Sequence, residues 1–502
     1  MVRVGTVMAM AAVVAVVALA AVVAEARGAV VGGADDGGEG KTGEGGARRA
    51  QHVIVLMMEN HSFDNVFGFL PGVGSLSTEV FNYVEAGNMS SERVNVTRGA
   101  PYCVKPDPIH IVPDVGDQVT APNSAFGHGY APTMGGFVEN FVRRTKATRP
   151  AEVMAGYTPE QLPVLSALAR NFRVYTRWHS AVAGSTGINR LFAHAGTSGS
   201  YTGGEYEAPG LKLEAPTLFE ALMAEGVSTR IEYVDFCSAH AIKPLADKHR
   251  HIFSRSHKLE AFFTSLREGT LANYTWVVPQ LLPALDAYPT SMHPSGDIRA
   301  GEALIKNVVE SLMASQYWND TILLITFDEH GGFHDTAPPP GPGVGSGPVP
   351  DPNPDIAPHP YTYDFTRLGV RVPTLLVSPW VDAGVDDTLY WGSSVPATVA
   401  AHFGLTSPPL TSRIAAAPRF NVDLRSSPRA PSSYPAVLPE PAPGPYCRIL
   451  RSDPAYGEEF LSMYQTLLDE AGICLPAHSR DVTTAYQAHQ WLLSAIAALF
   501  GQ

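Results

Sequence analysis

The segment Thr321–Asp335 (TILLITFDEHGGFHD) limits most strongly what this chain can fold into. Its first six residues are all β-branched or leucine, which predicts a strand buried on both faces, as in a parallel sheet. The apolar run stops at Asp328 and Glu329, and a glycine pair then favours a loop. Open α/β sheets bind ligands just beyond the carboxyl ends of their strands. The two carboxylates are therefore candidate ligands, and a solvated turn after a core strand is the alternative interpretation.

The first clearly predicted strand of the chain is also followed by oxygen-bearing side chains. Residues 51–58 are mostly apolar, and Glu59 and Asn60 follow them directly. The same region also fits the start of a helix, with Asn60 or Ser62 as its N-cap. The two interpretations are compatible, because a helix N-terminus beside such a site would help to hold an anion.

A third segment, Gly184–Arg190 (GSTGINR), sets a hydroxyl pair between two glycines. This pattern fits a loop that presents a nucleophile, with Arg190 supporting it or contacting an anion. A plain turn followed by an N-cap is the alternative interpretation.

The remaining apolar patterns alternate between strands and helices. We predict helices at 162–171, 218–225, 299–315 and 395–403, and strands at 172–175, 229–234, 274–278 and 370–379. The strand at 274–278, the helix at 299–315 and the strand beginning at Thr321 form a βαβ unit, which predicts a parallel pair. Residues 71–135 show few periodic runs and are expected to be irregular. The fold class is therefore α/β with a central, mostly parallel sheet.

The N-terminus has the features of an export signal. Arg3 precedes an apolar run at 4–23, and Ala24–Ala26 resembles a cleavage site, so residues 1–26 are predicted to be a signal peptide of a secreted protein. A signal anchor is the alternative, because the run is long enough to span a bilayer. Residues 27–50 are Gly-rich and predict a disordered linker. Residues 51–425 form the main predicted domain, and residues 426–502 a Pro-rich linker with a helical C-terminal region.

Net charge and cysteine content limit the expected partners and the possible disulfides. The net charge is −13 and the chain has no long basic tract, so nucleic acid is not an expected partner. The four cysteines allow three pairings, and Cys447 and Cys474 are the closest in sequence. Glycosylation motifs occur at five asparagines, Asn60, Asn88, Asn95, Asn273 and Asn319. Asn60 is expected to serve at the ligand site after the first strand, so a glycan is not expected there.

Five segments together resemble one known family. They are HVIVLMMENHSFDNVFG at 52–68, GSTGINR at 184–190, WNDTILLITFDEHGGF at 318–333, LGVRVPTLLVSPW at 368–380, and SSVPATVAAHFGL with LTSR between 393 and 413. In this order they resemble the phosphoesterases that include non-specific phospholipase C and a bacterial acid phosphatase. The resemblance implies the alkaline-phosphatase-like fold, an α/β/α sandwich, and makes residues 51–425 the catalytic domain.

The resemblance also implies a site for one divalent metal ion. Its ligands, carried over motif by motif, are Glu59, Asn60, Thr186, Asp328 and Glu329. All five offer oxygen, which hard cations such as Ca²⁺, Mg²⁺ and Mn²⁺ prefer and which Zn²⁺ also accepts. Thr186 is then the expected nucleophile, because a metal lowers the pKa of a coordinated hydroxyl.

Further residues receive roles through the same resemblance. His110 matches a position that contacts phosphate, and His293 one that protonates the leaving oxygen, a task for which histidine has a suitable pKa. Substrate contacts are expected from Asn189, Arg190 and His330.

The implied function is a secreted, metal-dependent phosphoester hydrolase that forms a phospho-threonine intermediate. Phospholipid head groups are the expected substrates, as for a phospholipase C, and peripheral membrane contact is compatible with this. Hydrolysis of small phosphomonoesters is the first alternative. A secreted binding protein on a catalytically decayed scaffold is the alternative from another class. The sequence indicates no oligomeric state.

Four family histidines are absent from this chain. The residues at their positions are Gly187, Gly296, Thr336 and Gly392, whereas His61 and His334 are additions. These departures leave the metal ligands intact and leave the choice between diester and monoester substrates open.

Overall fold

The computed structural model describes residues 50–121, 132–202, 213–235, 237–281, 288–341, 344, 363–406, 410–420 and 424–447. The chain divides into two units, Met1–Ala47 and Arg48–Gln502, and every described residue belongs to the second. The predicted signal peptide, nearly all of the Gly-rich linker and the helices expected after residue 450 lie outside the described residues. None of the described helices is long and apolar enough to cross a membrane.

An eight-stranded sheet forms the centre of the fold, in the order β13-β6-β12-β11-β1-β10-β8-β9. Its strands are β1 (His52–Met58), β6 (Arg173–Tyr175), β8 (Thr229–Tyr233), β9 (Phe253–Arg255), β10 (Tyr274–Val278), β11 (Thr321–Phe327), β12 (Thr374–Val377) and β13 (Gly384–Asp386). Only β12 runs antiparallel to its neighbours within this sheet. The predicted mostly parallel sheet is confirmed.

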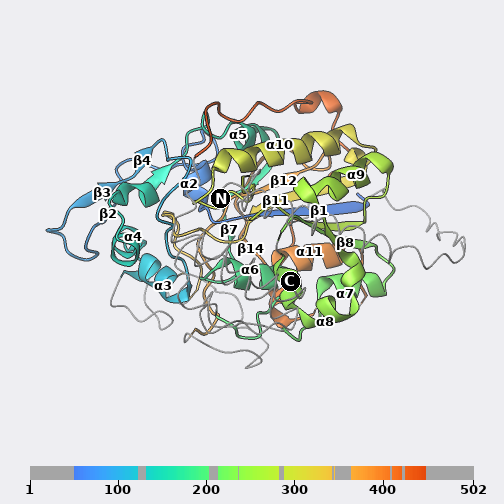
Figure 1. Cartoon of the computed structure of the whole chain (residues 1–502), viewed down its shortest axis with the longest axis horizontal. Coiled ribbons are helices and arrows are strands. Elements are labelled where there is room, and N and C mark those ends of the chain that lie inside the picture. Colours follow the sequence, from blue (N-terminus) through green and yellow to red (C-terminus); the bar gives the residue numbers. More distant parts are fainter. Residues whose placement is uncertain are drawn as a thin grey trace, which may run out of the picture. The chain divides into compact units, whose positions relative to one another are not determined.

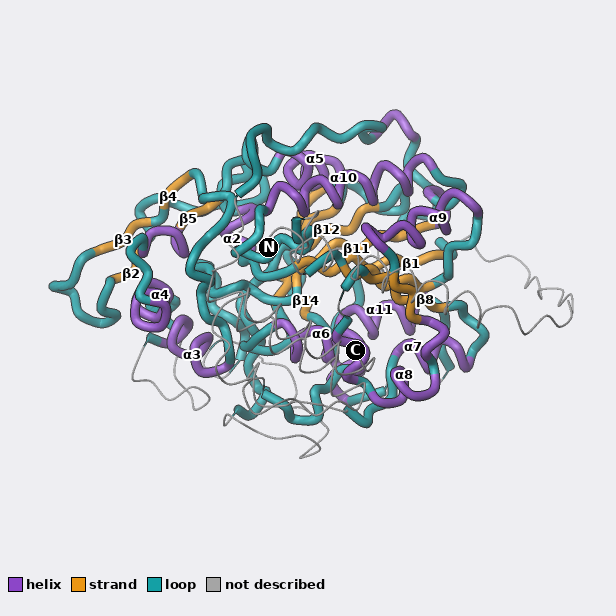
Figure 2. The backbone as a smooth tube through the Cα atoms, viewed as in Figure 1, coloured by secondary structure: helices purple, strands orange, loops and turns teal. Residues whose placement is uncertain are grey.

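Helices cover both faces of this sheet (Figures 1 and 2). One layer contains α5 (Pro163–Asn171), α9 (Glu260–Glu268) and α10 (Ile298–Ala314). The other contains α6 (Thr186–Ala195), α7 (Leu218–Ala224), α8 (Lys243–Lys248) and α11 (Ser394–His402). The predicted α/β/α sandwich is therefore confirmed. Four shorter helices lie outside these layers: α2 (Phe63–Phe67), α3 (Val112–Thr120), α4 (Phe137–Thr145) and α12 (Ser412–Ala416). Three separate two-stranded sheets also lie outside them. They are β2 (Phe81–Tyr83) with β3 (Arg93–Asn95), β4 (Thr97–Arg98) with β5 (Ala155–Gly156), and β7 (Trp178–His179) with β14 (Tyr390–Trp391).

The register of β1 and β11 positions the functional loops. The two strands are parallel neighbours, with His52 opposite Thr321 and Met58 opposite Phe327. Every residue of both strands is buried. Each buried valine, leucine or isoleucine side chain stabilises the fold by about 1.5–3 kcal/mol relative to exposure. Because the strands end at the same level, the residues that follow Met58 and Phe327 leave the sheet side by side.

Two predicted helix starts are confirmed by their caps. Thr217 and Glu220 form a reciprocal capping box at the start of α7. The Asp297 side chain accepts a hydrogen bond from the backbone of Arg299 at the start of α10.

The prediction that residues 71–135 are irregular is wrong in part. This region contains α3, and α4 follows just beyond it. The α3 sequence includes Pro113 and Gly116, which are poor helix formers, so its intrinsic propensity gives little signal. The helix forms because Val115 and Val119 pack with Phe137 and Phe141 of α4 in a second hydrophobic cluster.

The disulfide does not join the cysteines that are closest in sequence. Cys103 pairs with Cys447 across 344 residues. The segment 424–447 crosses the domain and ends beside α10, where the Cys447 backbone N–H donates to the Asp297 carboxylate over 2.7 Å. Cys474 lies outside the described residues. Sequence distance therefore failed as a guide, because the fold brings the segment around Cys103 next to residues that follow the predicted domain.

Candidate active site

The loops after β1 and β11 touch directly. The Asn60 backbone N–H donates to Asp328 Oδ1 over 3.2 Å, and the Glu329 N–H donates to the same oxygen over 2.7 Å. Asn60 has a φ of 60° and Gly331 a φ of 62°, both in the left-handed region. A Cβ at Gly331 would lie 2.2 Å from the Asn60 carbonyl oxygen, so only glycine allows this approach. The structure thus brings the two predicted ligand pairs together.

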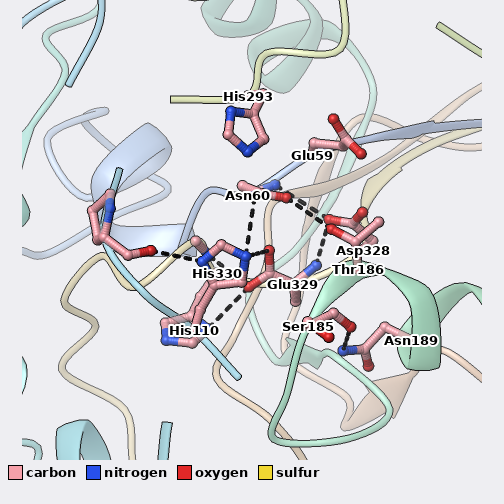
Figure 3. Close-up of polar contacts among 12 residues, drawn as sticks. Glu59, Asn60, His110, Ser185, Thr186, Asn189, His293, Asp328, Glu329 and His330 are labelled. Atoms are coloured by element: carbon pink, nitrogen blue, oxygen red, sulfur yellow. Dashed lines mark hydrogen bonds and ion pairs between the residues drawn. The ribbon is translucent and has the colours of Figure 1, made fainter. Parts of the chain in front are cut away.

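Thr186, at the start of α6, also contacts Asn60. It is the first residue of α6, with Ser185 in extended conformation before it, and its Oγ1 donates to Asn60 Oδ1 over 3.2 Å (Figure 3). The Asn189 side chain holds this loop, because its amide donates to the carbonyls of Gly184 and Ser185 and accepts from the Val182 N–H. Those bonds use the polar atoms of Asn189 within the protein, and its predicted contact with substrate stays a prediction.

A chain of hydrogen bonds fixes the orientation of Asn60. His110 Nδ1 donates to the Pro108 carbonyl over 2.7 Å, which leaves Nε2 as an acceptor in the neutral ring. Asn60 Nδ2 lies 3.3 Å from that Nε2 and donates to it, so Asn60 Oδ1 faces the Thr186 hydroxyl. His110 Nε2 is also 3.5 Å from Glu329 Oε1. His110 therefore lies in the site, where it orients the amide that contacts the predicted nucleophile.

Arg190 supplies positive charge beneath the loops. Its Nε donates to Asp328 Oδ2 over 3.0 Å, and its guanidinium lies 3.5 Å from Glu59 Oε1. The side chain is buried on α6, one turn after Thr186. We call Glu59, Asp328, Glu329 and Arg190 the site cluster. The Arg190 charge is engaged by protein carboxylates, and its predicted contact with substrate is untested.

The site cluster carries more negative charge than Arg190 can balance. Burial raises the pKa of Glu59 to about 7, against the opposing effect of Arg190. Burial also raises the pKa of Asp328. For Glu329 the effect of burial is outweighed by His110, His330 and the Gly331 N–H, which lower its pKa. Glu329 Oε1 is buried and accepts no hydrogen bond.

Two further histidines border the cluster. His293 lies on the Glu59 side of Asn60 in Figure 3, with Nδ1 2.7 Å from Ser295 Oγ and Nε2 3.8 Å from Asp107 Oδ2. His330 Nε2 donates to Gln118 Oε1 over 2.8 Å, and its Nδ1 lies 3.4 Å from Glu329 Oε2. His330 is buried beside Glu329, and its predicted contact with substrate is untested.

The donors fit a hard divalent cation. Within the described part of the chain, no three His, Cys, Asp or Glu side chains by themselves form a metal cluster. The proposed set also includes the Asn60 amide oxygen and the Thr186 hydroxyl, which lie 3.2 Å apart. Three buried carboxylates face one guanidinium, and one carboxylate oxygen lacks a hydrogen bond. Oxygen donors with an excess of negative charge are what Ca²⁺, Mg²⁺ and Mn²⁺ prefer.

Sequence reasoning missed a second carboxylate cluster next to the first. Arg371 donates from Nε to Asp335 Oδ1 over 2.9 Å and from NH2 to Asp64 Oδ1 over 3.0 Å. The Thr336 N–H and hydroxyl donate to Asp64 Oδ2, and the Asp64 N–H donates to Asp335 Oδ2. We call Asp64, Asp335 and Arg371 the brace. Asp64 is inside the first recognised motif and Asp335 lies two residues after the third, so a further acidic residue after each strand was the available signal.

Comparison with known proteins gives the same family as the motifs. The model of the Phosphoesterase family matches residues 50–406. Non-specific phospholipase C1 of Arabidopsis thaliana is 35% identical over 411 residues, which cover 77% of this chain and 73% of that protein. Non-hemolytic phospholipase C of Pseudomonas aeruginosa is 24% identical over 397 residues, or 72% of this chain and 55% of that protein.

Solved structures give only a distant likeness. A protein of the alkaline phosphatase superfamily from Vibrio parahaemolyticus aligns with 51% of this chain and 64% of its own, at 12% identity and a TM-score of 0.32. The family-model match and the Arabidopsis relative are sufficient: the chain belongs to the phosphoesterase family.

Proposed function

We propose that this protein is a secreted phosphoester hydrolase of the phospholipase C type, with Thr186 as its nucleophile. The observation that carries the proposal is the placement of the Thr186 hydroxyl, which is half-buried at the start of α6 and bonded to Asn60 beside the site cluster. The names of the Arabidopsis and Pseudomonas relatives favour phospholipids as substrates. The apolar N-terminal run supports export.

One divalent cation completes the proposed site. Glu59, Asn60, Thr186, Asp328 and Glu329 would hold it, and their three carboxylates less the charge of Arg190 leave two negative charges for it to balance. When bound, such an ion lowers the pKa of a coordinated hydroxyl and offsets charge on phosphoryl oxygens.

The proposed reaction has two displacements. Thr186 Oγ1 attacks phosphorus, the Oγ1–P bond forms, and the bond from phosphorus to the leaving alcohol breaks. The Thr186 hydroxyl proton passes to solvent, and protonated His293 gives a proton to the leaving alcohol oxygen. Water then attacks phosphorus and gives one proton to His293, the Oγ1–P bond breaks, and Oγ1 takes a proton from solvent to restore Thr186. The N-terminus of α6 favours the anionic phosphoryl group throughout.

A substrate and variant series tests this proposal. The purified protein would be assayed on phosphatidylcholine vesicles and p-nitrophenyl phosphate with Ca²⁺, Mg²⁺, Mn²⁺ or Zn²⁺. We expect turnover that a chelator abolishes, greater activity on the lipid, and loss of about 10³-fold or more in Thr186→Ala. Mass spectrometry of an acid-quenched reaction should place the phosphoryl adduct on Thr186.

Two results would contradict the proposal. Unchanged turnover in Thr186→Ala would remove Thr186 as the nucleophile. Absence of turnover on both substrates with all four metals, in a protein that still binds them, would favour the decayed binding protein instead. Thr186→Ser is the matched control, because it keeps a hydroxyl and should retain measurable activity.

A further inference from the structure

Gln118 of α3 contacts His330 at the edge of the site cluster. The residue is 1% exposed, and its Nε2 donates to the Ile109 carbonyl over 2.7 Å and to Asn140 Oδ1 over 3.0 Å. Both hydrogens of the amide are used in this way, so its oxygen is left to accept. That oxygen accepts from His330 Nε2 over 2.8 Å, and His330 directly follows the proposed metal ligand Glu329.

The direction of this hydrogen-bond chain is fixed at its far end by a carboxylate. Asn140 Nδ2 donates to Asp114 Oδ1 over 2.8 Å, and Arg144 Nε donates to the same oxygen over 2.7 Å. An ionised carboxylate can only accept, so the amide nitrogen of Asn140 must face Asp114 and its oxygen must face Gln118. Gln118 then turns its own oxygen toward the His330 ring, which carries a hydrogen on Nε2. The orientation of each group follows from the one before it.

The other end of the chain is the Glu329 carboxylate. Nδ1 of the His330 ring lies 3.4 Å from Glu329 Oε2 (Figure 3). The Gly331 N–H donates to the same oxygen over 2.7 Å. Oε1 is buried and accepts no hydrogen bond from any described residue. The position of the ring therefore bears on which carboxylate oxygen is bordered by the protein and which is left for a cation.

Packing between α3 and α4 does not by itself require this polar chain. The two helices already share an apolar contact formed by Val115, Val119, Phe137 and Phe141. Gln118 of α3 and Asn140 of α4 are each 1% exposed, and a buried amide costs free energy unless its polar atoms are bonded. Both polar atoms of the Gln118 side chain are bonded. A fully bonded buried network fixes orientation, which apolar side chains at the same places would not do.

We infer that Gln118 is a positioning residue, which holds the His330 ring against Glu329 Oε2 and so keeps Oε1 free for the divalent cation. The inference rests on the proposed function, because it takes Glu329 as a ligand of that ion. Gln118 acts through His330 and is not itself a proposed ligand. Removing a group that holds a metal ligand typically lowers metal affinity or activity by about 10–100-fold. The helix pair α3 and α4 thereby contributes to a metal site whose proposed ligands all lie outside these two helices.

Two substitutions separate the contact with His330 from the rest of the Gln118 amide. Gln118→Met has a similar length and lacks both the donor and the strong acceptor. Gln118→Glu keeps an oxygen that can accept from His330 Nε2, and loses the donors to Ile109 and Asn140. Calorimetric titration with Ca²⁺, Mg²⁺, Mn²⁺ and Zn²⁺ would show which ion the parent protein binds and measure the affinity of each variant for it. Urea unfolding without metal would measure the stability of each variant.

A second readout follows the hydrogen bond itself. The ring N–H of His330 would be observed by NMR in protein with isotope-labelled histidine, and identified by its absence in His330→Gln. A ring hydrogen that is bonded to the Gln118 side chain exchanges slowly with water and gives a signal. We expect this signal in the parent protein and in Gln118→Glu, and its loss in Gln118→Met. The spectra are recorded without metal, so they do not depend on the activity of the loaded enzyme.

We expect Gln118→Met to weaken binding of the ion by about tenfold or more. Gln118→Glu should lose stability but bind at least as tightly as the parent protein, because its carboxylate still holds the ring. The matched control is Gln161→Met, which removes an amide that bonds the backbone of Thr158 and Ala100. It should leave both the metal affinity and the NMR signal unchanged.

The inference is overturned if Gln118→Met binds the ion as tightly as the parent protein, or if both variants lose affinity in proportion to their stability. Tight binding by Gln118→Glu without the ring N–H signal would attribute the effect to charge and would also overturn it. If the parent protein binds none of the four ions, the proposed metal site itself fails. That outcome is distinct, because the others require a parent protein that binds an ion.

Discussion

The site cluster and the brace have similar composition but differ in how completely their carboxylate oxygens are hydrogen-bonded. Each combines carboxylates from the loops after β1 and β11 with one arginine from elsewhere in the fold. In the brace, all four carboxylate oxygens accept hydrogen bonds from Arg371, from Thr336 or from backbone N–H groups. In the site cluster, Glu329 Oε1 accepts none, and the one guanidinium, of Arg190, pairs with Glu59 and Asp328 but with no oxygen of Glu329.

The difference separates a structural cluster from one that is ready to bind. Buried polar atoms in folded proteins are normally satisfied, so an unsatisfied carboxylate oxygen indicates a missing partner. The brace needs no further partner and holds the two loops together. The site cluster gains most from a cation.

Removing either arginine should cause the largest loss of stability. Arg371→Met leaves the brace carboxylates buried without their cation, and Arg190→Met does the same to the site cluster. We expect each to lower the free energy of unfolding by about 3–5 kcal/mol without added metal. Urea unfolding would measure this.

The two arginine variants should then differ in their response to metal. A divalent ion should restore part of the stability of Arg190→Met, because it replaces the lost positive charge. It should restore less in Arg371→Met, where Thr336 and backbone N–H groups still bond three of the four carboxylate oxygens of the brace. Equal recovery in both variants would remove the distinction between the clusters.

Metal alone should stabilise the parent protein through the site cluster. A ligand present at 100 times its Kd stabilises the folded state by about 2.7 kcal/mol. We expect this gain to disappear in Glu329→Gln and to persist in Asp335→Asn, which neutralises a carboxylate of the brace. Unfolding with and without a chelator measures it, and a gain that survives Glu329→Gln would contradict the assignment.

Metal affinity should depend on pH through Glu59. Because burial raises the pKa of Glu59 to about 7, protons compete with the ion up to neutral pH, and not only below the usual 4.5. We expect the affinity to rise by up to about tenfold per pH unit (~1.4 kcal/mol) below pH 7 and to level off above it. Calorimetric titration between pH 5.5 and 8 measures this. Glu59→Gln should bind more weakly and lose most of the slope.

The smallest effect is expected within the brace. Thr336→Val removes the hydroxyl donor to Asp64 and keeps the backbone N–H and Arg371. We expect a loss of about 1 kcal/mol in unfolding free energy, measured in urea. Thr336→Ser keeps the hydroxyl and should lie close to the parent, and a loss as large as that of Thr336→Val would indicate packing instead.

Parts of this molecule were predictable because their signals are local. The apolar runs of β1 and β11 specify buried parallel strands, and the polar residues directly after them predict where the candidate ligand side chains meet. The caps at Thr217 and Asp297 are also local patterns, and the structure confirms them.

Other parts depend on contacts that sequence spacing does not encode. The helix α3 forms through tertiary packing against α4, despite its proline and glycine. The Cys103–Cys447 disulfide and the Arg371–Asp64 hydrogen bond join residues hundreds of positions apart. The contact of Asn189 with substrate stays a prediction, and the fold adds a role that the motif does not show, because its amide bonds the backbone of the loop that carries Thr186.

The site cluster is expected to bind one divalent cation and the brace none. Equilibrium dialysis with elemental analysis would count the metal ions on the parent protein, Glu329→Gln and Asp335→Asn. We expect one tightly bound ion per chain in the parent and in Asp335→Asn, and none in Glu329→Gln. No bound ion in the parent, or one ion retained in Glu329→Gln, would contradict it.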